Sequence, residues 1–423
     1  MRAADVAVLG AGPAGVAVAR RLAAQGASVV VVSGAPPAGA REGYSARTRA
    51  RLLAEGLDEA VATLVGPLAR SGVWGEGRAV AGAEWLADRA AFAAALWRAT
   101  ALPRIARLEG PATRVARATH GFAIDSPAGG VAARLVVDAR GRRGPQSRGP
   151  LLLALGQRFQ FRSRAPRTFI GPWSRGWCWL ADDGESVYVQ LAGRAGDAAP
   201  RAWFADAARE IPALRPILAA PRAGPATARP AHARLGRAST DPGLWRVGDA
   251  ALALDPLSGQ GVFEALRGAV AVAAAVVTVL EGGDAGSAAR FVAARHRESW
   301  RATVATAGGF YAENRHRGRF WSETAAAYAR LAEPAAPEAT RIERRPVLED
   351  GRIREREVLV TRSAPRGAWV VDGVPLVPLL ALVRDGAAIP DAAARLDRSP
   401  AAVAAALEWL KGAGALAPLS SGV

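Results

Sequence analysis

A glycine-rich turn within the first fifteen residues constrains the fold more than any other feature of the sequence. An apolar run at residues 5–9 leads directly into the turn, which precedes a helical pattern at 16–25 and a second apolar run at 28–32. Glycines spaced as G-x-G-x-x-G permit a tight turn, close approach of a pyrophosphate and close packing of helix on strand. The helix N-terminus then favours the phosphate charge. This context predicts a dinucleotide-binding unit of Rossmann type, whose turn residues are Gly10, Gly12, Pro13, Ala14 and Gly15.

The end of the second predicted strand departs from the usual pattern of this unit. Ser33 stands where an acidic residue ordinarily binds a ribose hydroxyl. A serine can still accept one hydrogen bond, but it offers less than a bidentate carboxylate. The ribose is therefore held less tightly or by other groups, which argues mildly against a tight NAD site.

A second cluster of glycine, aspartate and proline precedes the long apolar helical pattern that starts near residue 262. It begins with Gly248-Asp249, continues through Asp255-Pro256, and ends in the turn Ser258-Gly259-Gln260-Gly261 before Val262. One interpretation is an ordinary loop that caps a helix. The other is a helix N-terminus opened toward a ligand, with glycines that let backbone N–H groups approach an anionic atom.

Composition excludes several classes of protein. The single cysteine, Cys178, allows no intramolecular disulfide, and the four histidines are scattered, so the sequence predicts no metal site. The net charge of +17 comes almost entirely from arginines spread along the chain, with Lys411 as the only lysine, and such a distribution argues against a nucleic-acid arm. No leader precedes the first strand, and an apolar helix at 268–280 is shorter than the ~20 residues needed to span a bilayer. We therefore expect no membrane association and a cytoplasmic location.

The motifs together resemble those of a known family. Gly10 to Gly15, Asp88-Arg89 with Phe92, Asp138 after an apolar strand, and the 248–261 segment follow one another as in single-component FAD-dependent monooxygenases of the p-hydroxybenzoate hydroxylase type. The resemblance covers about residues 1–330 and implies FAD, reduced by NAD(P)H or an external reductant, with molecular oxygen as co-substrate. It implies that Asp249 holds the ribityl chain, that Arg89 lies near the phosphates or the ribityl chain, and that Pro256 lies beside the reacting face of the flavin. The implied cofactor-binding residues are the glycine turn with Ser33, Arg41, Arg89, Asp138, Gly248, Asp249, Pro256, Gly259, Gln260, Gly261 and Val262.

The resemblance also favours one branch of the superfamily. The segments at 41–52 and 258–269 are more similar to the branch that contains tryptophan halogenases, geranylgeranyl-type reductases and peptide-tryptophan-modifying flavoproteins. Halogenases of this branch need a lysine near the flavin and a Trp-x-Trp-x-Ile-Pro motif, whereas here Trp177-Cys178-Trp179-Leu180 lacks the Ile-Pro and no lysine precedes Lys411. The chain most resembles the peptidyl-tryptophan-hydroxylating flavoproteins of quinohemoprotein amine dehydrogenase maturation. A small-molecule aromatic hydroxylase and a flavin-bound DNA-binding regulator remain as alternatives.

Aromatic residues alternate along a predicted antiparallel sheet at 153–191. Trp177 and Trp179 should share one face of their strand while Cys178 points away. These rings form either the sheet core or an aromatic-lined substrate pocket. The pocket interpretation takes Trp173, Trp177, Trp179 and Tyr188 as substrate residues. Asp255 and Glu42, with Pro256, are the catalytic candidates nearest the motifs, although both acids could be structural.

The sequence thus predicts an α/β protein with a Rossmann-type FAD-binding domain, an antiparallel-sheet substrate domain and a small C-terminal winged-helix-like domain. The expected boundaries are 1–150 with 236–335 for the FAD domain, 151–235 for the substrate domain, and 346–423 for the last, with part of 40–90 able to join the substrate domain. Residues 334–345 have the composition of a linker. In the last domain we expect short helices at 391–397 and 399–411, with Ser399 as N-cap. Because the second helix carries Glu408 and Lys411 but no arginine, peptide binding fits better than DNA reading, and plain scaffolding is the third option. The expected partner is a peptide or small protein substrate, together with another maturation enzyme.

Overall fold

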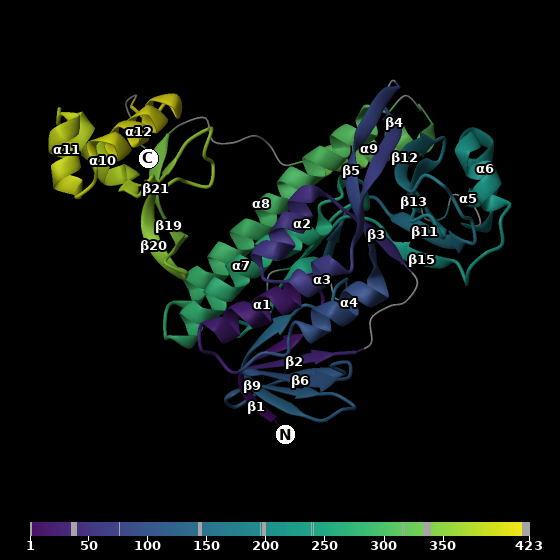
Figure 1. Cartoon of the computed structure of the whole chain (residues 1–423). Helices are drawn as coiled ribbons and strands as arrows, with labels where there is room; N and C mark the ends of the chain where they lie inside the picture. The colour runs from purple at the N-terminus through teal and green to yellow at the C-terminus, as the bar shows by residue number, and fades with distance from the viewer. Residues whose placement is uncertain are drawn as a thin grey trace. The chain divides into compact units, whose positions relative to one another are not determined.

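In the computed structural model, the chain folds into two compact units (Figure 1). The first comprises Met1–Val277 and Val292–Ala332, and the second comprises Thr278–Phe291 and Glu333–Val423. The structure describes residues 2–34, 40–75, 77–142, 146–194, 196, 200–237, 239, 241–314, 316, 318–332 and 340–416.

The first sheet of unit 1 confirms the predicted dinucleotide-binding unit. Its parallel strands lie in the order β6-β2-β1-β9, and α1 (Pro13–Ala24) connects β1 to β2. Residues 6–9 of β1 and 29–32 of β2 are buried, which is why these stretches are continuous hydrophobic runs in the sequence. The bounds are β1 (Arg2–Leu9), β2 (Val29–Ser33), β6 (Ile105–Glu109) and β9 (Val131–Asp138).

The other edge of this sheet is formed by a hairpin. Its strands are β7 (Arg114–Ala118) and β8 (Gly121–Asp125). Gly121 turns the chain at φ +116° and lies so close to Ala133 that a Cβ there would be 2.2 Å from its carbonyl oxygen. A short strand, β17 (Leu244–Arg246), pairs with the other half of β9 in parallel and delivers the chain to Gly248.

The second sheet of unit 1 has eight strands, in the order β15-β11-β14-β13-β12-β4-β5-β3. Pairing is antiparallel throughout except between β12 and β4, which confirms the predicted antiparallel region at 153–191 and adds strands from residues 41–88. The strands are β3 (Arg41–Tyr44), β4 (Val65–Trp74), β5 (Arg78–Asp88), β11 (Leu152–Phe159), β12 (Arg167–Trp173), β13 (Gly176–Asp182), β14 (Val187–Arg194) and β15 (Thr227–Pro230). A smaller sheet joins β10 (Gln146–Arg148), β16 (Arg234–Gly236) and β18 (Leu252–Ala253).

Each face of the eight-stranded sheet carries its own hydrophobic cluster. On one face, Trp177 and Trp179 pack with residues of the 252–257 segment and of α8 (Ala285–Ala312) and α9 (Arg319–Leu331). On the other, Cys178 and Leu180 pack against α5 (Pro200–Glu210), a short 3-10 turn (Pro212–Leu214) and α6 (Arg215–Leu218). The predicted alternation along β13 is therefore confirmed.

The helix that follows the second glycine cluster is longer than expected. α7 (Gly261–Leu280) has 20 residues and is, by length and composition alone, long and apolar enough to cross a membrane, contrary to the expectation from 268–280. However, 61% of its most apolar window is buried inside the protein, and Val272, Ala275 and Val276 are fully buried. The helix is therefore largely buried within the protein itself.

Three shorter helices complete the N-terminal half of unit 1: α2 (Ala46–Ala54), α3 (Asp58–Ala62) and α4 (Arg89–Arg98). α4 starts as predicted, because the Asp88 carboxylate accepts hydrogen bonds from the backbone N–H groups of Ala90 and Ala91.

Unit 2 is a small domain with its own core. The hairpin β19 (Arg341–Glu349) and β20 (Arg352–Val360) is followed by the short pair β21 (Val370–Val371) and β22 (Val374–Pro375) and by three helices. The helices are α10 (Leu376–Arg384), α11 (Ile389–Leu396) and α12 (Pro400–Gly412), and their core includes Leu359, Leu376, Leu379, Val403 and Leu410. The two predicted helices and the Ser399 cap are confirmed, because the Ser399 hydroxyl accepts from Ala402 N–H.

Two expectations about this unit change. Residues 341–345 are strand, so the expected linker is wrong there and the boundary at 346 falls within β19; the rest of the linker, 334–339, lies outside the described residues. The hairpin is also fastened to the corner between α7 and α8, where Thr278 Oγ1 accepts from Ile353 N–H at 2.8 Å and Ser287 Oγ donates to Glu355 at 2.6 Å. The winged-helix assignment stays a prediction, because any strand after residue 416 lies outside the described residues.

Candidate active site

The three glycines of the first turn have different structural roles. Gly10 has φ +106°, and a Cβ there would lie 2.6 Å from the Ala139 carbonyl oxygen. A Cβ at Gly15 would lie 2.1 Å from the Gly10 carbonyl oxygen, so this glycine permits helix-on-strand packing. A Cβ at Gly12 would meet nothing within 4 Å, so this position borders open space. Gly10 and Gly15 serve the fold, whereas Gly12 leaves room for a ligand.

The N-terminus of α1 is suited to an anion. Gly12 is the N-cap and provides no side-chain hydrogen bond, Pro13 occupies the first turn, and no acidic residue lies there. Ser33 is engaged locally, because its hydroxyl accepts from Ala11 N–H at 3.1 Å and donates to the Gly34 carbonyl. Ser33 therefore anchors the turn itself, and no carboxylate from β2 competes with a bound phosphate.

The second glycine cluster meets the first turn. Gly248 has φ +60°, and a Cβ there would lie 2.9 Å from the Ala14 Cβ, so only glycine lets this segment approach α1 so closely. The next residue, Asp249, is partly exposed and accepts a hydrogen bond from Arg142 Nε at 3.2 Å. Arg142 also donates to the backbone carbonyls of His232 and Leu254. Two segments far apart in sequence thus converge at one helix N-terminus, which favours the ligand-site interpretation over an ordinary loop.

The start of α7 provides a second exposed helix N-terminus. Pro256–Ser258 form a single 3-10 turn that ends at Gly259, which has φ +61°. Added Cβ atoms at Gly259 and Gly261 would meet nothing within 4 Å. Open space therefore borders both glycines at the positive end of the helix dipole. Two N–H groups of the turn are already engaged, because Gly259 N–H donates to the Pro256 carbonyl and Gln260 N–H donates to Ser258 Oγ.

Asp138, another predicted cofactor residue, is committed to an ion pair. It lies at the end of β9 and binds Arg140 through both oxygens, each at 2.9 Å. This contact raises the pKa of Arg140. Any influence of Asp138 on a bound cofactor would therefore act through Arg140.

Asp255 is buried and fully hydrogen-bonded. Its Oδ1 accepts from Leu257 N–H at 3.0 Å, and its Oδ2 accepts from the hydroxyls of Tyr311 at 3.0 Å and Tyr328 at 2.6 Å. Burial raises the pKa of Asp255, and the hydrogen bonds from Tyr328, Leu257 and Tyr311 oppose that rise. Because no carboxylate oxygen is left without a donor, Asp255 fixes the turn that carries Pro256 rather than serving as an open base. Sequence reasoning missed Tyr311 and Tyr328, which lie in helical patterns without any motif.

Glu42 is also paired. Its carboxylate accepts from the Tyr44 hydroxyl at 2.8 Å and forms an ion pair with Arg89 at 2.9 Å. Its neighbour Arg41 pairs with Asp183 at 2.5 Å and with Asp88 at 3.4 Å. The predicted residues Arg41, Glu42 and Arg89 are thus brought together at the start of α4, as a charged network rather than a free acid.

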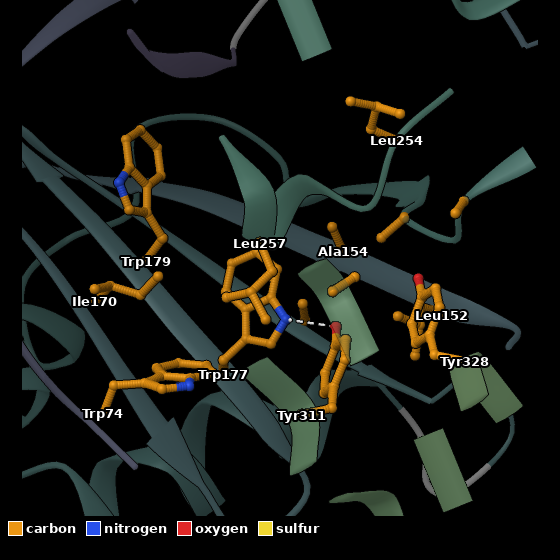
Figure 2. Close-up of a cluster of buried hydrophobic side chains, with 14 of the residues drawn as sticks. Trp74, Leu152, Ala154, Ile170, Trp177, Trp179, Leu254, Leu257, Tyr311 and Tyr328 are labelled. Atoms are coloured by element: carbon orange, nitrogen blue, oxygen red, sulfur yellow. Dashed lines mark hydrogen bonds between the residues drawn. The ribbon is translucent and has the colours of Figure 1, made fainter. Parts of the chain in front are cut away.

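The aromatic face of the large sheet lies against the Pro256 turn. We use this name for the cluster that holds Trp177, Trp179, Leu254 and Leu257 (Figure 2), to which Tyr188 also belongs. Trp177 Nε1 donates to the Tyr311 hydroxyl at 3.2 Å, which links the sheet to the Asp255 network. Trp179 and Tyr188 are in edge-to-face contact, with ring centroids 6.3 Å apart.

One predicted substrate residue does not belong to this face. Trp173 lies in the opposite cluster, edge-to-face with Trp203 at 6.3 Å. In the hairpin of β12 and β13, Trp173 is paired with Gly176, which shares its face with Cys178 and not with Trp177. The prediction that Trp173 lines the same pocket as Trp177 and Trp179 is wrong, because the strand register turns it away.

Several proteins of known structure share this architecture. Neither protein-family models nor the sequences of curated proteins match the chain, but solved structures do. The peptidyl tryptophan dihydroxylase QhpG, essential for tryptophylquinone cofactor biogenesis, is 32% identical with a TM-score of 0.82, covering 97% of this chain and 99% of that one. The flavin-dependent halogenase CmlS is 18% identical, with a TM-score of 0.72 over 98% and 96% of the two chains. HpxO of Klebsiella pneumoniae, solved with FAD and uric acid, is 16% identical with a TM-score of 0.60 over 78% and 93%.

The fold and the site define a flavoprotein oxidoreductase. The similarity to QhpG extends over nearly the whole of both chains, and this chain belongs to the FAD-dependent monooxygenases. The residues present fit FAD, because Gly12, Gly259 and Gly261 border open space at two helix N-termini and no acidic side chain caps α1. When bound, reduced FAD supplies the activation of molecular oxygen for transfer of one oxygen atom to an aromatic ring.

Proposed function

We propose that this monooxygenase hydroxylates the tryptophan side chain of a peptide or protein during the maturation of a quinone cofactor. The observation that carries the proposal is the full-length similarity to a peptidyl tryptophan dihydroxylase. The position of the aromatic face supports it, because Trp179 and Tyr188 lie in the same cluster as the 252–257 segment beside the predicted flavin site.

Different residues of the chain would have different roles in such a reaction. The N-termini of α1 and α7, with Asp249, would hold FAD. Arg89 and Glu42 would border the cofactor site at the start of α4. The Asp255–Tyr311–Tyr328 network would fix the Pro256 turn beside the reacting ring. Apolar side chains such as Leu254 and Leu257 would exclude water, which strengthens every electrostatic contact at the reaction centre.

The sequence argues against halogenation, although halogenases share the fold. No lysine precedes Lys411 in the chain, and Lys411 itself is paired with Glu408 at 2.7 Å in the second unit. The same pairing leaves α12 poorly suited to reading DNA.

The proposal is tested with the full-length, FAD-loaded protein and a series of tryptophan-containing peptides. We expect consumption of NAD(P)H or of an external reductant to depend on the peptide, and oxygen from isotopically labelled O₂ to appear on its indole ring. Turnover with small phenols but with no tryptophan peptide would instead support a small-molecule aromatic hydroxylase. Halide incorporation without hydroxylation would contradict the proposal.

Unit 2 extends the proposal to a larger partner. A second contact with a protein substrate, or with another maturation enzyme that holds it, would raise the effective concentration of the tryptophan at the active site. The excess of arginine would favour an acidic partner. Removal of residues 333–423 should then raise KM for a protein substrate but not for a short peptide, with FAD content as the control for folding. Equal KM values for the protein substrate before and after removal would show that this unit is only a scaffold. The winged-helix character of the unit and the cytoplasmic location of the protein stay predictions.

A further inference from the structure

A buried carboxylate on the aromatic face belongs to none of the recognised motifs. Glu84 lies on β5 and is only 8% exposed. Its Oε2 accepts a hydrogen bond from Trp179 Nε1 at 3.2 Å. The carboxylate therefore reaches the same aromatic cluster as Trp177 and Tyr188, although β5 and β13 are not neighbours in the sheet.

A glycine on β3 makes room for this carboxylate. A Cβ at Gly43 would lie 2.1 Å from Glu84 Oε1 and 3.0 Å from Trp179 Cζ2. Gly43 does not have a positive φ, so its backbone conformation does not require glycine. The small residue leaves space for the carboxylate in its present position, because a side chain there would displace the carboxylate and press against the ring.

The second oxygen of Glu84 is not committed. Within the part of the chain that the structure describes, no donor lies within hydrogen-bond distance of Oε1. Glu55 provides the contrast, since it is equally buried at 8% but both its oxygens form ion pairs, with Arg21 at 2.8 Å and Arg51 at 2.7 Å. Unlike the fully buried Nε1 of Trp173, Glu84 Oε1 is not sealed from solvent, so a donor supplied by a ligand can reach it.

We propose that Glu84 Oε1 accepts the ring N–H of the substrate, and that this contact selects indole over aromatic rings without such a donor. The inference rests on the proposed function, because it names the group that would recognise the tryptophan side chain. A carboxylate acceptor gives a strong, directional hydrogen bond and fixes which edge of the ring faces the flavin. No proton leaves the ring in this contact, so Glu84 binds and orients the substrate.

The experiment compares wild type with Glu84→Gln, which keeps the shape and the Trp179 contact but can turn an N–H donor toward the substrate. Three otherwise identical peptides carry tryptophan, 1-methyltryptophan or naphthylalanine, and both kcat/KM and binding to the oxidised enzyme are measured. Sites built to bind a donor reject analogues that lack it by as much as ~10⁴-fold, and we expect at least ~10²-fold preference for tryptophan in the wild type. In Glu84→Gln this preference should fall to less than ~10-fold, because tryptophan binding weakens while 1-methyltryptophan binding does not.

Two further variants make the result decisive. Glu55→Gln, the matched buried carboxylate outside the aromatic face, should leave the preference unchanged. Gly43→Ala should reduce the preference as Glu84→Gln does, since it displaces the carboxylate. Unchanged preference in both Glu84→Gln and Gly43→Ala, with normal FAD content, would overturn the inference.

The outcome remains separable from that of the proposed function. If the wild type hydroxylates no tryptophan peptide, the proposed function fails. Binding of free indole against 1-methylindole to wild type and Glu84→Gln then still decides whether Glu84 recognises a ring N–H. Equal affinities of the wild type for these two probes would contradict the role of Glu84 directly.

Discussion

The two faces of the eight-stranded sheet use similar residues for different purposes. Both faces are rich in tryptophan, but the cluster with Trp173, Trp203 and Cys178 consists of apolar side chains packed against α5 and α6. The buried carboxylate of Asp182, at the end of β13, accepts from Gly184 N–H in the turn that follows. Trp173 Nε1 is buried and has no hydrogen-bond partner among the residues that the structure describes, and burial raises the pKa of the Cys178 thiol. On the aromatic face, by contrast, the indole N–H groups of Trp177 and Trp179 are both hydrogen-bonded, to Tyr311 and Glu84.

The difference shows which cluster is a core and which is a candidate site. Buried carboxylates are costly to maintain and are rare in a plain hydrophobic core. The aromatic face contacts two of them, Asp255 through the tyrosines and Glu84 through Trp179, and it adjoins the Pro256 turn. We therefore expect changes on the first face to alter stability and changes on the second to alter catalysis as well.

The largest effect on stability should come from the apolar face. Trp173→Ala should lower the free energy of unfolding by about 3–5 kcal/mol, because it leaves a cavity beside Trp203. Denaturant unfolding measures this, while FAD content and kcat of the remaining folded protein should stay near wild type. A loss of kcat in folded, FAD-loaded Trp173→Ala would break the distinction between the faces.

The second-largest effect on stability should come from Asp255, whose carboxylate holds the turn that carries Pro256. Asp255→Asn should lower the free energy of unfolding by about 1.5–3 kcal/mol, because it weakens hydrogen bonds that a charged acceptor makes with two tyrosine hydroxyls. It should also reduce kcat, since the turn beside the flavin is no longer fixed. Tyr328→Phe, which removes a single donor, serves as the graded control and should cost about 1 kcal/mol. Wild-type kcat in Asp255→Asn would show that the network is structural only.

The third prediction concerns FAD binding by the 248–261 segment, which adjoins the aromatic face. Asp249→Ala should weaken FAD binding by about 1–3 kcal/mol, the usual cost of leaving hydrogen-bonding groups unpaired. Fluorescence titration of the apoprotein with FAD measures the change, and Trp173→Ala provides a control with unchanged affinity. Tight FAD binding by Asp249→Ala would count against the assignment of this segment.

The smallest expected effect is a pH dependence. Because burial raises the pKa of Asp255 above its ordinary value of 3.8, the folded state binds this proton more tightly than the unfolded state. The resulting stabilisation is complete below 3.8 and is lost as the pH rises through the folded pKa. Relative to Asp255→Asn, the wild type should therefore lose stability as the pH is raised from 3.8. A difference that is independent of pH would show that Asp255 does not titrate in this way.

Much of the flavin site follows from local sequence. The spacing of Gly10, Gly12 and Gly15 between apolar runs requires only short-range geometry, and the structure has the turn where it was predicted. The shared face of Trp177 and Trp179 also follows locally, because side chains alternate along any strand.

What the sequence could not determine depends on contacts between distant segments. The face of Trp173 is decided by the register of a hairpin, in which a slip of one residue would reverse it. The approach of Gly248 to Ala14, the convergence of Tyr311 and Tyr328 on Asp255, and the position of Glu84 against Gly43 and Trp179 all join residues from separate elements. No local pattern encodes such meetings, since they result from the packing of whole strands and helices, so only the tertiary structure shows which carboxylates are satisfied and that Glu84 Oε1 has no donor among the described residues.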